Sequence, residues 1–125
     1  MLTGVAVPVS SLRSELSTGI GEFPDLVLLG AWCKRAGLDL IQVLPVNDTG
    51  GDASPYNARS AYALNPVYVR LEDVPGWQGY AGEIMTAKKR FAAAERLQYG
   101  PVLQAKMQIL RRIFESMRQI GRAHV

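Results

Sequence analysis

The sequence predicts an α/β fold that opens with a strand, a helix and a second strand. Residues 4–9 are a short apolar, β-branched run without alternation, as in a strand that a sheet buries on both faces, and residues 40–45 form the second strand. Between them, residues 24–36 repeat apolar side chains at the three- and four-residue spacing of an amphipathic helix. About thirty residues separate the two strands, a length that suits a crossover between parallel strands.

The ends of these elements carry matching signals. Pro8 lacks a backbone N–H, so we expect it at the end of the first strand or at a sheet edge. Pro24 suits a first helical turn, with Asp25 near the positive end of the helix dipole, and Gly37 can adopt the left-handed conformation that ends a helix. We expect Cys33 to be a packed thiol rather than a nucleophile. The apolar stripe of this helix comprises Leu26, Leu29, Cys33 and Ala36, widened by Leu28 and Trp32.

A long polar segment, 46–66, follows the second strand. Loops of this length are uncommon in compact domains and are usually functional or disordered. Its aromatic side chains favour an ordered loop, and α/β folds hold their ligands where parallel strands end. The alternating residues 67–71 then predict a half-exposed strand.

The last third predicts two amphipathic helices, interrupted at Tyr99-Gly100-Pro101. Apolar residues recur at helical spacing on both sides of this break, and the second pattern ends at Met117 or Arg118. The expected buried positions are Ile84, Ala87, Phe91, Ala94, Leu97, Leu103, Met107, Leu110, Phe114 and Met117.

Composition narrows the class of protein. The chain has 125 residues, enough for one domain at most, and is 48% hydrophobic and 20% charged, as globular proteins are. Its apolar runs are too short for a membrane helix, and no secretory leader pattern opens it. The single cysteine excludes an internal disulfide framework and fits a reducing compartment. We therefore expect a cytoplasmic protein with no membrane partner.

Positive charge gathers in residues 81–125, which hold nine Lys or Arg and three Asp or Glu. A nucleic-acid-binding helical protein is one alternative, and it would bind through residues 88–118 in a salt-dependent way. Charges on amphipathic helices are usually solvated, however, and no aromatic residues lie among these for base stacking. We expect no nucleic-acid partner. The residues of this possible anion-binding face are Lys88, Lys89, Arg90, Arg96, Lys106, Arg111, Arg112 and Arg118.

Motifs for other chemistries are incomplete. Gly19-Ile20-Gly21 and Gly50-Gly51 lack the lysine of a phosphate loop and the spacing of a dinucleotide motif, so we interpret them as turn glycines. A lone histidine, His124, cannot form a catalytic triad or a histidine metal site. We expect neither a metal nor another cofactor.

The long loop holds the remaining candidates for a binding site. A stiff proline precedes an aromatic ring in Ser54-Pro55-Tyr56, and hydroxyl, amide and charged groups surround it. A rigid ring among such groups suits a sugar, which stacks its apolar face and hydrogen-bonds through its edge. A turn with a packed tyrosine explains the composition equally well. The candidate residues are Ser54, Tyr56, Asn47, Asp48 and Arg59, with Asp52 and Asn57 nearby.

Several motifs around this loop follow one another in a familiar order: Leu44-Pro45, Thr49-Gly50, Ser54-Pro55-Tyr56, Ser60-Ala61-Tyr62-Ala63 and Asn65-Pro66. They resemble the N-terminal signature of the 4-alpha-glucanotransferases, the amylomaltases or disproportionating enzymes of glycoside hydrolase family 77. The likeness runs from about Gly4 to Glu115. It includes Ser10-Ser11-Leu12 and Gly19-Ile20-Gly21-Glu22-Phe23 upstream, and more weakly Tyr99, Val102, Lys106 and Phe114 downstream.

The resemblance implies a (β/α)8 TIM barrel that transfers α-1,4-glucan segments between maltooligosaccharides, or to glucose, by a retaining double displacement. By the same resemblance, Tyr56 would be the aromatic wall beside the sugar next to the scissile bond, and Ser54 would hydrogen-bond in that groove. The commoner pattern has Gly-Pro at Asn47-Asp48 and Gln, Ser and Phe at Asn57-Ala58-Arg59. Asn47-Asp48-Thr49 is more similar to the branch that contains the plant cytosolic enzyme.

The chain does not hold a whole barrel, which needs about 250 residues. Retaining chemistry uses two carboxylates about 5 Å apart, and in this family they belong to later strands. The acids Glu22, Asp48, Asp52, Glu72 and Asp73 match none of those motifs, so we assign no catalytic residue. We expect the isolated chain to be inactive, and aggregated or molten, because a partial barrel exposes a strand edge and apolar helix faces. The alternative function is a non-catalytic maltooligosaccharide-binding module.

The tail suggests a boundary near residue 119. Residues 120–125, Ile-Gly-Arg-Ala-His-Val, are what a common short-read sequencing adapter encodes in one frame. We therefore expect 1–119 to be an incomplete N-terminal portion of a glucanotransferase barrel and 120–125 to be adapter-derived.

Overall fold

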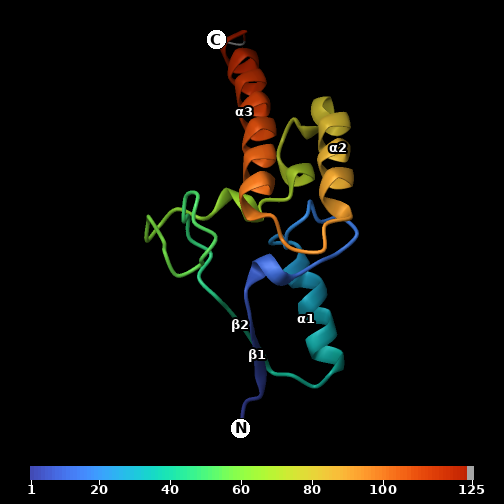
Figure 1. Cartoon of the computed structure of the whole chain (residues 1–125), viewed down its shortest axis with the longest axis vertical. Helices are drawn as coiled ribbons and strands as arrows, with labels where there is room; N and C mark the ends of the chain where they lie inside the picture. The colour runs from blue at the N-terminus through green and yellow to red at the C-terminus, as the bar shows by residue number, and fades with distance from the viewer. Residues whose placement is uncertain (124–125) are drawn as a thin grey trace.

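The computed structural model describes residues 1–123; His124 and Val125 lie outside the described residues. Strand β1 (Gly4–Val7), helix α1 (Asp25–Arg35) and strand β2 (Leu40–Val43) form one end of the molecule. Helices α2 (Ala81–Ala92) and α3 (Tyr99–Ala123) form the other end, and residues 44–65 project to one side between them (Figure 1).

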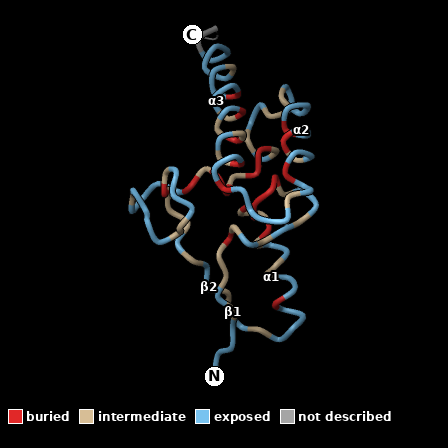
Figure 2. The backbone as a smooth tube through the Cα atoms, viewed as in Figure 1, coloured by how far each residue is buried: buried red, intermediate tan, exposed pale blue. Residues whose placement is uncertain are grey.

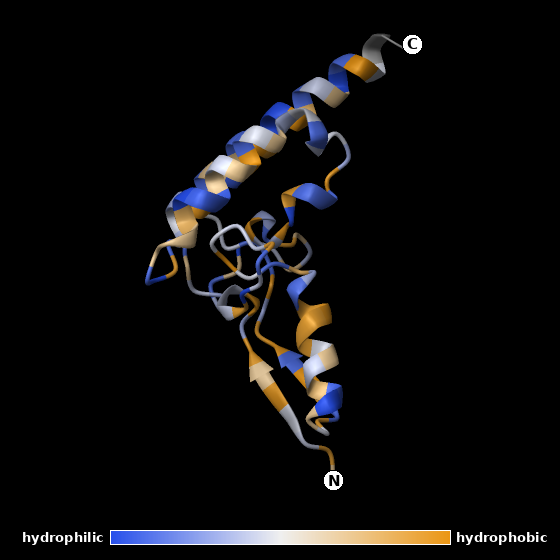
Figure 3. Ribbon diagram, turned by 90° about the vertical axis from the view of Figure 1, so that its right-hand side faces the viewer, coloured by the Kyte–Doolittle hydropathy of each residue, from blue (hydrophilic) through white to orange (hydrophobic). Residues whose placement is uncertain are grey.

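The opening βαβ unit is confirmed. β1 and β2 pair in parallel, from Gly4 opposite Leu40 to Val7 opposite Val43, and α1 lies between them in the chain. Pro8 directly follows β1, as its missing N–H requires. The expectation that the first strand is buried on both faces is wrong, because the described sheet has two strands and the residues of both are exposed or half-buried. Figure 3 shows hydrophobic residues on both strands and on α1.

Helix α1 has the expected caps. Pro24 is its N-cap, and Gly37 has a φ of +78° just after its end. Cys33 is buried, as expected, but Leu28 and Trp32 are more than half exposed. The two-stranded sheet is too narrow to cover an apolar stripe as wide as the one that the sequence indicates.

The strand expected at 67–71 is wrong, since two single 3-10 turns, Pro66–Tyr68 and Leu71–Asp73, occupy this stretch. The Asn65 side chain accepts a hydrogen bond from the Val67 N–H (3.0 Å), and Pro66 favours the turn that this bond begins. The carbonyl groups of Val67 and Val69 accept hydrogen bonds from the Lys106 ammonium group instead of from a neighbouring strand.

The two C-terminal helices are confirmed, but their limits differ from those expected. α2 ends at Ala92, so Ala94 and Leu97 lie beyond it. Tyr99-Gly100-Pro101 begins α3, because a first helical turn tolerates a proline. α3 continues to Ala123, past the expected end at Met117 or Arg118.

The buried face of α3 is also displaced by one residue from the expected one. Phe114 is 63% exposed and Met117 43%, whereas the next face of the helix is buried. That face includes Lys106, which was expected from the sequence to be one of the solvated charges. The buried residues of α3 are Tyr99, Val102, Lys106, Ile109 and Ile113.

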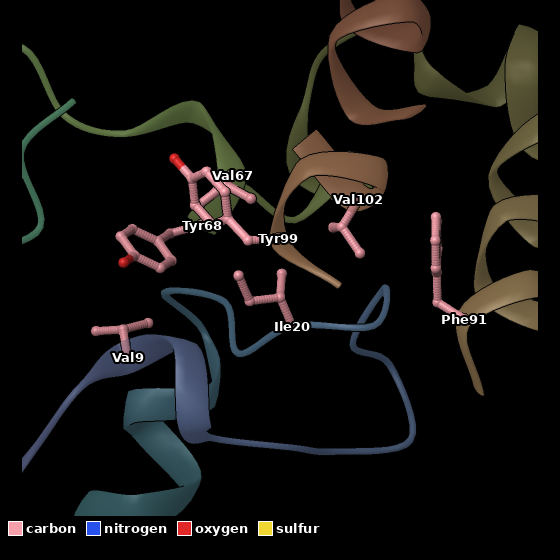
Figure 4. Close-up of a cluster of buried hydrophobic side chains, with 7 residues drawn as sticks. All are labelled: Val9, Ile20, Val67, Tyr68, Phe91, Tyr99 and Val102. Atoms are coloured by element: carbon pink, nitrogen blue, oxygen red, sulfur yellow. The ribbon is translucent and has the colours of Figure 1, made fainter. Parts of the chain in front are cut away.

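The core lies where the N-terminal loop, α2 and α3 meet, and not on the sheet (Figure 2). One apolar cluster joins these three regions through Ile20, Phe91 and Val102 (Figure 4). Gly21 fits beneath it only without a side chain, because a Cβ there would overlap the Val9 carbonyl oxygen. The cluster consists of Val9, Ile20, Val67, Tyr68, Phe91, Tyr99 and Val102, and a second one of Leu71, Ile84, Ala87, Ile109 and Ile113.

Candidate functional site

The loop after β2 is ordered, as expected, and its base is closed. The Asp48 N–H donates to the Ala63 carbonyl (2.8 Å), and the Asn65 N–H donates to that of Val46 (2.9 Å). Asn47 and Leu64 form an antiparallel bridge at the same level. The two arms of the loop therefore run side by side before the chain turns through residues 49–60.

The Asp52 carboxylate organises the turn that carries the Ser-Pro-Tyr motif. It accepts hydrogen bonds from the Ser54 N–H (2.9 Å) and the Asn57 amide (2.7 Å). These two bonds, from Ser54 first and Asn57 second, lower the pKa of Asp52 below its ordinary value. The Tyr56 N–H in turn lies 3.4 Å from the Ser54 hydroxyl. The turn is thus held by its own polar side chains.

The structure separates the five candidate residues into two groups. Ser54 and Tyr56 occupy the outer turn, where Tyr56 is 71% exposed and so is not a packed tyrosine. Asn47, Asp48 and Arg59 lie nearer the base of the loop. The Arg59 N–H donates to the Asp48 carbonyl (2.7 Å), and the Asp48 carboxylate accepts from the Gly50 N–H (2.8 Å).

Three buried polar side chains attach this loop to α3, and composition and periodicity alone did not reveal them. The Tyr99 hydroxyl lies 2.9 Å from the Asn65 amide nitrogen, 3.0 Å from the Gly50 carbonyl and 3.1 Å from the Thr49 hydroxyl. Thr49, Asn65 and Tyr99 are all more than 90% buried. Their separation along the sequence, up to 50 residues, leaves no local spacing that could signal the contact.

A second buried polar cluster ties the N-terminal loop to the rest of the fold. The Lys106 ammonium group lies 2.5 Å from a Glu22 carboxylate oxygen, and both side chains are fully buried. Arg70 bonds the other Glu22 oxygen (3.0 Å) and an Asp25 oxygen (2.6 Å). The expectation that Lys106 is one of the solvated charges is therefore wrong, and so is its place in the possible anion-binding face. Asp25 also accepts hydrogen bonds from the hydroxyls of Ser14 and Ser17.

The pKa values in this cluster shift in directions that follow from burial and pairing. Burial lowers the pKa of Lys106, and the Glu22 carboxylate only partly opposes this. Burial would lower the pKa of Arg70 as well, but its bonds to Glu22 and Asp25 raise it overall. For Asp25, the hydrogen bonds from Ser14, Ser17, Glu22 and Arg70 outweigh burial, so its pKa is lowered.

The lowered pKa of Asp25 predicts acid sensitivity. Its folded pKa lies below the ordinary value of 3.8, so its contribution to stability is complete above that pH and is lost as the pH falls through the folded pKa. Urea unfolding at a series of acidic pH values should show this loss, and it should be weaker in Asp25→Asn. A loss of equal steepness in the variant would contradict the assignment.

The charged side chains of this region suit structure and binding rather than acid–base chemistry. Glu22 and Asp25 are paired with buried cations, and Asp48 and Asp52 hold the loop. Within residues 1–123, no three His, Cys, Asp or Glu side chains gather as a metal site would require. None of the helices in this described range is long and apolar enough to cross a membrane.

Comparison with known proteins decides the family. The sequence profile of the 4-alpha-glucanotransferases matches residues 7–124. The chain belongs to the 4-alpha-glucanotransferase family. The resemblance inferred from its loop motifs is thereby confirmed.

Individual 4-alpha-glucanotransferases align over nearly the whole chain. That of Chlamydia caviae is 38% identical over 120 residues, which cover 94% of this chain and 23% of the relative. One from rice (Oryza sativa subsp. japonica) is 40% identical over 121 residues, covering 90% of this chain and 12% of the relative. The chain therefore spans less than a quarter of the length of these relatives.

A solved amylomaltase structure has a similar fold over the length of this chain. The amylomaltase from Corynebacterium glutamicum superposes with a TM-score of 0.78 at 28% identity, over 95% of this chain and 19% of the amylomaltase. The α/β character of the chain agrees with this likeness.

Proposed function

We propose that residues 1–119 are the N-terminal portion of a (β/α)8 barrel and that residues 46–65 form one wall of its α-glucan-binding groove. The observation that carries this proposal is the exposed Tyr56, which lies on a loop whose arms are joined by backbone hydrogen bonds and anchored through buried Thr49 and Asn65. Such a ring offers a flat apolar face to a sugar at small entropic cost, because the loop is already ordered. The family of the chain supports an α-1,4-glucan as the ligand.

In this proposal each candidate residue has a role in the groove. Tyr56 stacks on the sugar beside the scissile bond, and Ser54 hydrogen-bonds to a sugar hydroxyl. Asn47, Asp48 and Arg59 lie at the base of the loop, where they line the groove and shape the turn. The isolated chain holds one face of the groove and does not transfer glucan.

The uninterrupted protein would act as a transferase of α-1,4-glucan segments, between maltooligosaccharides or to glucose. The retaining mechanism needs a carboxylate nucleophile and a carboxylic acid that becomes the base, and neither requires a cofactor. We assign both to strands that follow residue 119, and we regard 120–125 as adapter-derived. The single cysteine and the solvated charges favour a cytoplasmic protein that binds glucan and not nucleic acid.

The test begins with a long sequencing read across the genomic locus and continues with the protein that the locus encodes. We expect the frame to continue past codon 119, and the purified protein to convert maltotriose to glucose and longer chains. Tyr56→Ala should lower kcat/KM about tenfold or more, whereas Tyr56→Phe, which keeps the ring, should stay near the wild type.

Two outcomes would contradict the proposal. Unchanged kcat/KM in Tyr56→Ala would remove Tyr56 from the groove. A stop codon directly after Val125, with binding of maltoheptaose but no conversion, would instead establish a non-catalytic maltooligosaccharide-binding module.

A further inference from the structure

We propose that Tyr99 is a positioning residue of the glucan-binding groove, and that its hydroxyl sets the placement of the loop that carries Tyr56. This inference rests on the proposed function of that loop. Tyr99 is the first residue of α3, and its ring is 8% exposed. It therefore acts from outside the groove, through the loop.

The Tyr99 hydroxyl joins both arms of the loop at one point. It accepts a hydrogen bond from the Asn65 amide (2.9 Å) on the returning arm. On the outgoing arm it meets the Gly50 carbonyl (3.0 Å) and the Thr49 hydroxyl (3.1 Å), and its single proton can go to either. Asn65 also donates to the Thr49 hydroxyl (3.3 Å), so the arms are linked to each other as well as to α3.

The ring of Tyr99 is held independently of the loop tip. It packs in the apolar cluster with Val67, Tyr68 and Val102, and its hydroxyl points away from Ile20 (Figure 4). Lys106, which is buried on the same helix, fixes the segment after the loop by donating to the carbonyls of Val67 (2.7 Å) and Val69 (2.8 Å). Helix α3 is thus a rigid support against which the loop is placed.

A short chain of contacts leads from this support to the sugar-binding turn. The Thr49 hydroxyl, beside that of Tyr99, donates to the Asp52 carbonyl (2.6 Å). The Asp52 carboxylate then holds the Ser54 N–H (2.9 Å), and the Ser54 hydroxyl lies near the Tyr56 N–H. Loss of the Tyr99 hydroxyl would leave the buried Thr49 and Asn65 side chains and the half-buried Gly50 carbonyl short of a partner, and the loop would relax toward water to satisfy them.

The experiment uses Tyr99→Phe in the uninterrupted glucanotransferase, with Tyr80→Phe as the matched control. Tyr80→Phe also removes a hydroxyl, one that contacts the Ser116 hydroxyl (2.5 Å) and the Arg112 carbonyl (3.1 Å), both on α3, and Tyr80 packs against the second apolar cluster. We expect Tyr99→Phe to raise the KM for maltotriose about fivefold to tenfold. Tyr80→Phe should leave KM unchanged, even where its melting temperature falls by a similar amount.

A double variant separates positioning from general weakening of the fold. In a Tyr56→Ala background, Tyr99→Phe should raise KM by less than twofold, because the side chain that it positions is gone. An equal rise in both backgrounds, or no rise in the single variant, would overturn the inference. If Tyr99→Phe does not fold, Thr49→Val decides the matter, since it breaks the same link from the loop side and should give the same rise in KM.

The outcome also distinguishes the inference from the function on which it rests. Unchanged KM and kcat in Tyr56→Ala would contradict the proposed groove itself. A strong effect of Tyr56→Ala with no effect of Tyr99→Phe or Thr49→Val would leave the groove in place and reject only the role of Tyr99.

Discussion

Lys106→Met is expected to lower the free energy of unfolding by about 3–5 kcal/mol, the usual cost of removing one partner from a buried ion pair. Methionine keeps the length of the side chain but leaves the buried Glu22 carboxylate without this cation. It also leaves the carbonyl groups of Val67 and Val69 without their donor. Urea unfolding of the uninterrupted glucanotransferase, followed by fluorescence, measures the loss, and the same protein serves for the variants below.

Two further variants keep this result interpretable. Lys89→Met removes an exposed lysine from α2 and should change stability by less than about 0.5 kcal/mol. Glu22→Gln combined with Lys106→Met should destabilise by less than the sum of the single changes, because the double variant removes both charges of the pair, whereas each single change strands one of them. A loss below about 1 kcal/mol in Lys106→Met would show that the ion pair is dispensable.

Gly21→Ala is expected to lower the free energy of unfolding by about 3 kcal/mol, at the upper end for overpacking. The new Cβ would overlap the Val9 carbonyl oxygen and approach the Leu12 carbonyl oxygen to 2.8 Å. Both are backbone atoms, so no side-chain rotation can relieve the overlap. Thermal unfolding with circular dichroism detection would report the loss.

The control for this prediction is the same substitution at Gly30, in the middle of α1. Nothing lies within 4 Å of a Cβ placed there, and alanine is a better helix former than glycine. Gly30→Ala should therefore raise the free energy of unfolding by about 0.5–1 kcal/mol. Similar changes at the two glycines would mean that the N-terminal loop yields easily, contrary to the packing described above.

The elements that sequence reasoning found are those whose signals are local. Pro24 and Gly37 mark the ends of α1 whatever lies around it, and the spacing of the two strands leaves few connections other than a crossover. The loop motif was found in the same way, because Ser54, Pro55 and Tyr56 are adjacent in the sequence.

The features that the sequence did not predict depend on residues far apart in the chain. Residues 67–71 alternate like a strand, but Lys106, 39 residues beyond Val67, donates a hydrogen bond to the Val67 carbonyl group. Lys106 also explains why the buried face of α3 was predicted wrongly, because the periodicity of apolar residues assigns a charged residue to the solvent-exposed face. For the anchor of the loop, the family resemblance drew attention to Thr49, Asn65 and Tyr99 separately, and no local spacing indicated that the three side chains meet.

The pairing of Glu22 with Lys106 also constrains the order of events during synthesis on the ribosome. At about 5–20 residues per second, the 84 positions between them take roughly 4–17 s to translate. Arg70 is made earlier and bonds one Glu22 oxygen, but the other oxygen lacks Lys106 throughout that interval, and enclosing a charge with incomplete pairing is costly. The N-terminal loop therefore cannot reach its final packing until α3 emerges, which makes α3 the element that completes the core of this chain.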